Sequence, residues 1–551
     1  MLGTGRWPVA SRCKYRCAAV AARCQSHGRP TKGGKPFALR RTARRMRFQY
    51  QEVPTLPPLA WCARVDRGSD SVSVFHGALV ETRSEGFIEG AWDDAFAPFN
   101  FIAATIIVGT GATLDRGRVR FTTSTDHMGP LFSIAKGDSV FVSNSPAFAM
   151  SMSQERPDDI YPFYGYDLIR IYRQGQHCPD GRLRLRSGIS LGVHFATIIT
   201  VDERGSLRFA RHRLCEPFSD YQSYKALLLE GMKKLFENGS DPSRKQTYRP
   251  VVSLSNGYDS TAAAALARAA GCVEALAFVD ERKDDPEGDS GAANARLLGM
   301  ECSEYSRWEY IRLDGGAEAE FAYGAANSMV SLAAAEDQVR GCILLNGDFG
   351  DTIWVAKSAK VGGHLSRTWL RYTLGITQIE FRLRVGYQGI AVPCIGARRN
   401  QAIYDLAVSE EMRPWSIGGD YDRPIPRRIA EEAGLPRDRF GMRKAATGHS
   451  HLNDPSRFSE QSLNDYRRFV SERHAEVPQH IYRYWRARAR WHHYLLKTFG
   501  RRDRRYVRST PLQRRFPFIL NARPIPATWD YMFTFQWSVA SMRNRYAFPL
   551  G

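Results

Sequence analysis

The residues best suited to chemistry lie in one loop, Ser255-Asn256-Gly257-Tyr258-Asp259-Ser260. The apolar run 251–254 before it predicts a buried strand, and the Ala-rich run 261–270 after it predicts a helix that ends at Gly271. A helix start after a small-residue loop presents backbone N–H groups to an anion. Asp259 adds a carboxylate, the ligand type that Mg²⁺ takes beside phosphates. The loop therefore predicts a site for a nucleotide and its metal, the alternative being a tight turn without a ligand.

A second acidic loop follows another buried strand. The apolar run Cys342–Asn346 leads into Gly347-Asp348-Phe349-Gly350-Asp351, about 90 positions after the first loop. Two aspartates between glycines also suit a solvated turn. Between the two loops, however, strand patterns alternate with helical ones. We therefore expect a parallel sheet whose ligands bind at the carboxyl ends of its strands.

Both loops resemble those of one family. The first resembles the S-G-G-x-D-S signature of PP-loop ATP pyrophosphatases, in particular the asparagine synthetase branch, with Asn256 replacing the first Gly. The second resembles the G-E-G-x-D-E-L/I loop of that branch. There Asp351 falls on the metal-binding Asp and Asp348 on a Glu with an acid/base or amine-orienting role, whereas Thr352 replaces a further Glu. The order Pro424–Ala430, Leu435-Pro436 and Arg443-Lys444 is similar to the family's closing pattern.

The resemblance implies ATP and Mg²⁺ as ligands. Asp259 and Asp351 would hold the metal, and Lys444 and Asp348 would be catalytic, with Lys444 as the cation near the α-phosphate. A surface lysine is the alternative for Lys444. The implied nucleotide-binding positions are Leu254, Ser255, Asn256, Gly257, Tyr258, Asp259, Ser260, Phe278 and Gly347.

Residues 46–206 show short strands and turns, which predict a β-rich domain. The predicted strands cover 71–75, 101–108, 119–123, 139–143 and 196–201, with a hairpin turn at Asp115-Arg116-Gly117. The order of Phe87–Trp92 and Asp126–Phe132 is similar to the N-terminal glutaminase domain of asparagine synthetases. That class uses an N-terminal Cys whose α-amine is its base. Position 2 is Leu2 and Cys62 lies inside the chain, so we expect no glutamine hydrolysis.

The charge distribution, the cysteines and the length of the apolar runs restrict the classes of protein to which this chain can belong. Residues 1–45 hold twelve Lys/Arg and no Asp or Glu, so the net charge of +21 leaves +9 on the rest of the chain, an ordinary value for an enzyme with acidic ligands. We expect residues 1–45 to be a disordered basic leader: either untranslated sequence upstream of Met46, a transit-like segment or a nucleic-acid-binding tail. The ten scattered cysteines suit reduced thiols in the cytoplasm. No apolar run is long enough to cross a bilayer.

The expected fold class is α/β, in four parts. A leader over 1–45 precedes an Ntn-hydrolase-like α+β domain over 46–206, a PP-loop domain of the adenine nucleotide α-hydrolase-like kind over 207–455, and a helical extension over 456–551. In that extension Arg and aromatic residues predict a packed helical face rather than a base-stacking surface.

The expected function is ATP-dependent amide formation: a substrate carboxylate is adenylated, and ammonia or an amine then takes the acyl group. Asparagine biosynthesis and natural-product amidation are both consistent with this chemistry. The sequence leaves open whether the chain forms a homodimer. The alternatives are a PP-loop enzyme that modifies RNA and a non-catalytic scaffold. The charge distribution favours small-molecule substrates over nucleic acid.

Overall fold

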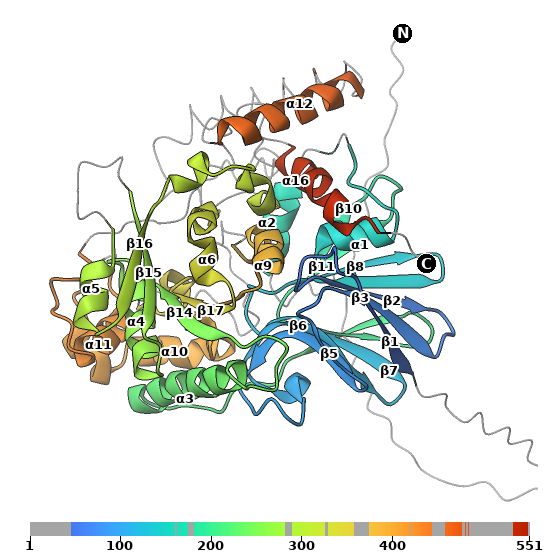
Figure 1. Ribbon diagram of the computed structural model, residues 1–551. Helices are drawn as coiled ribbons and strands as arrows, with labels where there is room; N and C mark the ends of the chain where they lie inside the picture. The colour runs from blue at the N-terminus through green and yellow to red at the C-terminus, as the bar shows by residue number, and fades with distance from the viewer. Residues whose placement is uncertain are drawn as a thin grey trace, which may run out of the picture. The chain divides into compact units, whose positions relative to one another are not determined.

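Three β-sheets organise the described part of the chain (Figure 1). The computed structural model describes residues 46–159, 161, 164–174, 181–280, 289–324, 329–356, 374–419, 421–442, 458–476, 480, 483, 487 and 533–548. Lys444, the leader 1–45 and most of the extension 456–551 lie outside these residues, so the predictions made for them stay predictions. The described residues belong to one compact unit, which starts at Arg44.

The N-terminal region consists of two sheets in which every pairing except that of β1 with β3 is antiparallel. The first sheet has the order β1 (Arg47–Glu52), β3 (Ser71–His76), β2 (Trp61–Asp66), β9 (Ser139–Ser143), β8 (Leu131–Lys136), β11 (Ser190–His194), β10 (Gly181–Arg184). The second has the order β13 (Leu207–Arg211), β12 (Thr197–Val201), β7 (Arg118–Thr122), β6 (Ile107–Asp115), β5 (Gly86–Trp92), β4 (Glu81–Arg83). The β-rich character predicted for this region is confirmed.

Aromatic residues from the two sheets pack into a shared core. The Trp61 ring of the first sheet lies 4.9 Å from the Phe87 ring and 6.0 Å from the Phe121 ring of the second. Arg116 and Gly117 both have positive φ and close a two-residue hairpin, as predicted. The strand predicted over 101–108 is partly wrong, because 101–103 form a short 3₁₀ helix and β6 begins only at Ile107.

A separate, all-parallel sheet follows, as the alternating strand and helix patterns predicted. Its order is β16 (Glu301–Ser306), β15 (Glu274–Val279), β14 (Arg249–Ser253), β17 (Cys342–Asn346), β18 (Gln388–Ala391). The chain thus moves outward from β14 to β16 and then crosses to the other side of β14. The order reverses between the neighbours β14 and β17. The described chain is therefore mixed α/β, with an antiparallel-rich N-terminal region and a parallel sheet.

Helices cover the parallel sheet and the N-terminal region. The helix predicted after the first loop is α4 (Tyr258–Ala269), and its buried alanines Ala262 to Ala267 let it pack closely on the sheet. The other α-helices are α1 (Pro146–Met152), α2 (Tyr164–Gln174), α3 (Tyr221–Gly239), α5 (Ala292–Leu297), α6 (Glu336–Val339), α7 (Gly350–Ile353), α8 (Leu374–Thr377), α9 (Ile379–Val385), α10 (Asn400–Ala407), α11 (Pro424–Glu432), α12 (Glu460–Glu476) and α16 (Thr534–Arg543).

A buried ion pair joins the N-terminal region to the parallel sheet. Arg382 of α9 donates to Glu89 of β5 through Nη1 at 2.6 Å and Nη2 at 3.0 Å. Gln388, Thr110 and Asn144 also donate to the Glu89 carboxylate. Neither charge is exposed, so the network fixes one region against the other.

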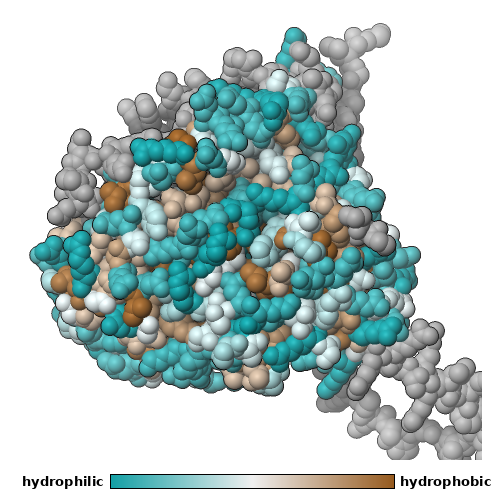
Figure 2. Space-filling view, viewed as in Figure 1, coloured by the Kyte–Doolittle hydropathy of each residue, from teal (hydrophilic) through white to brown (hydrophobic). Residues whose placement is uncertain are grey.

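The described part of the C-terminal extension packs its aromatic residues inward. The Phe535 ring of α16 stacks on Tyr164 at 4.6 Å, and Trp537 stacks on Phe458 at 5.4 Å. On the face drawn in Figure 2, hydrophobic residues lie singly or in small groups among hydrophilic ones. Within the described residues, every helix is too short or too polar to span a membrane.

Candidate functional site

The two predicted loops lie next to each other at the carboxyl edge of the parallel sheet. β14 runs into the loop 254–257 and then α4, and β17 runs into residues 347–349 and then α7. These two strands are paired neighbours, and the strand order reverses between them. Open parallel sheets bind their ligands at such a reversal point.

Two glycines let the loops touch. A Cβ added at Gly347 would collide with the backbone of Asp259 and Ser260, and one at Gly350 would collide with the Asp259 carboxyl group. Between them Phe349 has φ +67°, a left-handed conformation that strains a non-glycine residue. The turn therefore holds the second loop directly against Asp259.

Three aspartates gather where the loops meet: Asp259, Asp348 and Asp351. The pKa of Asp348 is raised to about 7, mainly by burial and further by the charges of Asp351 and Asp259. Its Oδ2 is buried and has no hydrogen-bond partner among the described residues. Thr352 donates to Asp351 Oδ1 at 3.0 Å. A buried acceptor without a partner is rare in folded proteins and marks Asp348 as a functional candidate.

Sequence reasoning missed Arg423, which pairs with Asp259. Its Nη1 lies 3.1 Å from Oδ1 and 3.0 Å from Oδ2 of that carboxylate. Arg423 immediately precedes α11, and its side chain is only 6 % exposed. Arg423 and Asp259 are 164 positions apart, and local sequence patterns do not predict a pairing over that separation.

Hydrogen bonds within the first loop fix its shape. Ser255 Oγ and Ser260 Oγ lie 2.7 Å apart, and Thr261 Oγ1 donates to the Ser255 carbonyl at 3.1 Å. Gly257 is the N-cap of α4 and supplies no side chain to the first N–H groups of that helix. An uncapped helix start of this kind is suited to bind an anion.

The predicted nucleotide-binding positions differ in what their side chains do. Tyr258 is buried in the core, where its hydroxyl contacts Arg427 and its ring packs on Tyr421 at 4.9 Å. Only its backbone can therefore reach a ligand. Asn256 binds other parts of the chain, because its Oδ1 accepts from Asn294 at 3.3 Å and its carbonyl oxygen accepts from the Gly441 N–H at 2.8 Å.

Leu254 is buried, whereas Phe278 is half-buried at the end of β15, 6.2 Å from the Tyr305 ring. Phe278 therefore keeps part of its surface at the carboxyl edge of the sheet. Gly347 contributes by its lack of a side chain, as the close approach of the two loops requires.

Asp259 and Asp351 can supply part of a Mg²⁺ coordination shell, with phosphate oxygens and water supplying the rest. Among the described residues, no three His, Cys, Asp or Glu side chains gather as a metal-binding group. Mg²⁺ does not need such a group, because it binds through one or two carboxylates together with phosphate oxygens and water. Asp259 and Asp351 supply two carboxylates, although Arg423 contacts both oxygens of the first.

The N-terminal region reaches the same edge through residues 124–129. Asp126 accepts hydrogen bonds from Ser124 Oγ at 2.6 Å and Met128 N at 2.9 Å, and more weakly from Ala391 N at 3.4 Å. The adjacent His127 is buried with its ring 6.0 Å from Phe349, and burial lowers its pKa to about 4. Cys62 is fully buried on β2, and burial raises the pKa of its thiol, so it is no exposed nucleophile.

No protein-family model matches the chain, and a comparison with curated proteins found no match either.

Proposed function

We propose that this chain is an AMP-forming amide synthetase of the asparagine synthetase kind. In this proposal the parallel-sheet region has a PP-loop fold, and the N-terminal region has an Ntn-hydrolase-like fold without glutaminase chemistry. The meeting of Asp259 with Asp348 and Asp351 at the reversal point of the sheet carries the proposal. Carboxylates beside an uncapped helix start suit a triphosphate and its Mg²⁺.

In the first step, an oxygen of the substrate carboxylate attacks the α-phosphorus of ATP. A new P–O bond forms, the bond to the bridging oxygen breaks, and pyrophosphate leaves with the electron pair. Backbone N–H groups of the 255–260 loop would bind the leaving pyrophosphate, and Lys444 would offset charge at the α-phosphate. Mg²⁺ held by Asp259 and Asp351 would supply charge neutralisation for the phosphates.

In the second step, ammonia or an amine attacks the carbonyl carbon of the acyl-adenylate. A C–N bond forms, the C–O bond to the phosphate breaks, AMP leaves with that electron pair, and the nitrogen loses a proton. The unpartnered Oδ2 of Asp348 would accept this proton, because it is a buried acceptor beside the two metal-binding carboxylates.

The nitrogen donor would be free ammonia or an amine, because Cys62 on β2 lies inside the chain, is fully buried and has no free α-amine to act as the base for glutamine hydrolysis. The N-terminal region then serves as a wall of the site through residues 124–129. The described cysteines are free thiols, which suits a cytoplasmic enzyme. The substrate would be a small carboxylic acid.

Carboxylate-dependent exchange of radioactive pyrophosphate into ATP tests the proposal. Wild-type protein should catalyse the exchange with at least one member of a panel of amino and dicarboxylic acids. Asp259→Asn should lower the exchange at least about 100-fold, because it removes a metal ligand while keeping the shape of the side chain. Asp337→Asn is the matched control, because that side chain is fully exposed and belongs to α6 rather than to either loop. Exchange that persists in Asp259→Asn would refute the assignment.

One observation favours a second function, that of a non-catalytic scaffold. Arg423 engages both oxygens of Asp259, which a metal would also need. Asn256 and Thr352 also depart from the patterns they resemble. The scaffold predicts that calorimetry detects no binding of ATP in the presence of Mg²⁺, whereas the synthetase predicts saturable binding that Asp259→Asn weakens.

A further inference from the structure

Arg423 contacts Asp259 in a geometry that differs from the structural ion pair of the fold. One nitrogen, Nη1, lies 3.1 Å from Oδ1 and 3.0 Å from Oδ2 of Asp259. Arg382 instead places two nitrogens on Glu89, Nη1 at 2.6 Å and Nη2 at 3.0 Å, which is the fork geometry of a strong pair. Arg423 therefore engages its carboxylate with only one arm of the guanidinium.

The rest of the Arg423 guanidinium has donors to offer. Its Nε and Nη2 make no hydrogen bond to the described residues, and neither is a fully buried atom. The guanidinium carbon lies 5.4 Å from the centre of the Tyr421 ring, and that ring packs on Tyr258 at the start of α4. Asp259 itself belongs to the first turn of α4. Donors on two nitrogens thus remain for an anion beside the uncapped start of this helix.

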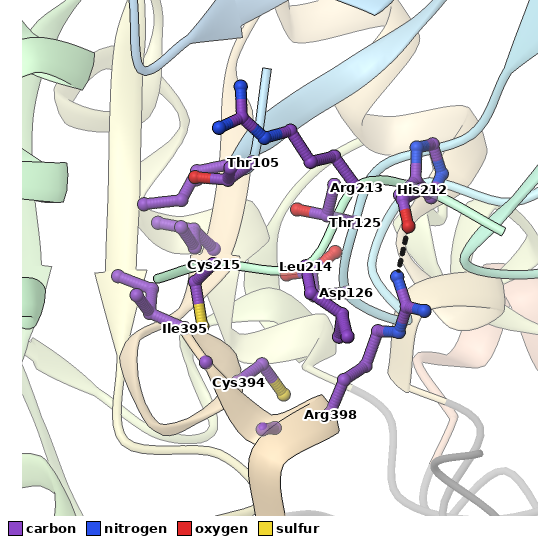
Figure 3. Close-up of a pocket in the computed structure, with 14 residues that line it drawn as sticks. Thr105, Thr125, Asp126, His212, Arg213, Leu214, Cys215, Cys394, Ile395 and Arg398 are labelled. Atoms are coloured by element: carbon purple, nitrogen blue, oxygen red, sulfur yellow. Dashed lines mark hydrogen bonds between the residues drawn. The ribbon is translucent and has the colours of Figure 1, made fainter. Parts of the chain in front are cut away.

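Two other arginines show the contrasting arrangement, in which the guanidinium is tied to the backbone. Arg398 lines a small cavity where the N-terminal region meets the turn after β18, and it donates to the backbone oxygen of His212 (Figure 3). Arg399 donates to the backbone oxygen of Cys215 from Nε at 2.9 Å and from Nη2 at 2.6 Å. Backbone oxygens of this kind are fixed by the fold. The partner of Arg423 is instead a carboxylate, for which Mg²⁺ would compete.

Arg423 and Mg²⁺ cannot share Asp259. Both are cations, and the guanidinium contacts the same two oxygens that a metal would take. A metal at Asp259 would leave Arg423, whose side chain is only 6 % exposed, without its counter-ion, which is unfavourable. ATP brings negative charge to the start of α4, so metal and nucleotide together can compensate for this loss, whereas the metal alone cannot.

We propose that Arg423 couples the binding of metal and nucleotide. It pairs with Asp259 before the nucleotide arrives, and it turns to the phosphates of ATP when Mg²⁺ takes its place on the carboxylate. This inference rests on the proposed function, because the ligands that exchange are those of the synthetase. It deepens that function by making the site selective for the complex of Mg²⁺ with a nucleoside triphosphate over free divalent cations.

Two binding measurements on Arg423→Met test the exchange. ATP binding in the presence of Mg²⁺, measured by calorimetry, should weaken about tenfold or more relative to wild type, because a charge-assisted hydrogen bond to phosphate is lost. Binding of Mn²⁺ without nucleotide, measured by electron paramagnetic resonance, should tighten, because the Asp259 carboxylate is released. Changes of opposite sign in one variant identify the exchange, since a purely structural arginine would weaken both affinities or change neither.

Arg423→Lys is the conservative variant. One charged arm is enough for either partner, so ATP affinity should stay within about threefold of wild type. Arg437→Met is the control, because that half-exposed arginine pairs with Glu431, and it should bind both ligands as wild type does. Circular dichroism checks that each variant is folded, and Arg423→Gln, which removes the charge but keeps donors, replaces Arg423→Met if the latter unfolds.

The results separate failure of this inference from failure of the proposed function. If wild type binds Mg-ATP and the charge-removing variant binds it equally well, or if both affinities change in the same direction, the exchange is wrong and the synthetase stands. If wild type binds no ATP in the presence of Mg²⁺, both the exchange and the synthetase are wrong.

Discussion

Two carboxylates with enclosed oxygens differ in how they are satisfied: Glu89 of β5, which contacts Gln388 at the start of β18, and Asp348, which follows the carboxyl end of β17. Glu89 accepts hydrogen bonds from Arg382, Gln388, Thr110 and Asn144 through both of its oxygens. Asp348 has one oxygen without any partner among the described residues, and two further carboxylates raise its pKa.

This difference separates a structural charge from a candidate for chemistry. A carboxylate with a full set of donors resists change and holds two regions together. A carboxylate without donors destabilises the folded state unless a ligand, a metal or a proton satisfies it. We therefore expect the removal of Glu89 to damage the fold and the removal of Asp348 to damage only the reaction.

The largest effect should follow from Glu89→Ala. The variant leaves the Arg382 guanidinium buried without its counter-ion, which should lower the free energy of unfolding by about 3–5 kcal/mol. Urea unfolding followed by tryptophan fluorescence measures the loss. Glu410→Ala is the control, because its pair with Arg413 is exposed and its removal should change stability by less than about 1 kcal/mol. Equal losses in the free energy of unfolding for Glu89→Ala and Glu410→Ala would contradict the structural role assigned to Glu89.

A smaller, pH-dependent effect should follow from Asp348→Asn. The pKa of Asp348 in the folded chain, about 7, lies above the ordinary value of 3.8, so the folded state favours the protonated acid. Protonation of Asp348 therefore adds to the free energy of unfolding. This contribution is fully present below about pH 4, is lost as the pH rises to 7, and amounts to at most about 4 kcal/mol.

Unfolding of wild type and Asp348→Asn at several pH values between 4 and 8 measures this contribution. The variant should lack that part of the pH dependence and be the more stable of the two above pH 7. Asp337→Asn, with its fully exposed side chain, should follow wild type throughout. Parallel curves for wild type and Asp348→Asn would mean that Asp348 is satisfied in solution.

The strands and the two loops could be predicted from the sequence because their signals are local. Apolar runs before small-residue loops gave β14 and β17, and strand β9 was predicted with the bounds that the structure has. The alternating strand and helix patterns predicted a parallel sheet, and the structure shows that β14 and β17 are paired neighbours within it. Local order along the chain thus sufficed to predict which strands end in acidic loops.

The ion pairs between residues far apart in the sequence could not be predicted. Arg423 lies 164 positions from Asp259, and Arg382 lies 293 positions from Glu89. Each arginine sits in an ordinary stretch of helix or helix start, where a solvated surface is the usual expectation. Tyr258 stands in the motif itself, yet its ring belongs to the core, because α11 packs against α4 and covers it.

Asp259 is intermediate between the fully satisfied Glu89 and the partly unsatisfied Asp348. Arg423 contacts both oxygens of Asp259, yet the Asp259 side chain is 19 % exposed. Arg423→Met should therefore raise the affinity for Mn²⁺, a stand-in for Mg²⁺, by about tenfold, because the metal no longer competes with a charge-assisted hydrogen bond. Electron paramagnetic resonance of free Mn²⁺ measures the change. Arg437→Met is the control, because that half-exposed arginine pairs with Glu431 instead. If Mn²⁺ binds neither protein, Asp259 is a structural charge like Glu89, and the scaffold function gains over the synthetase.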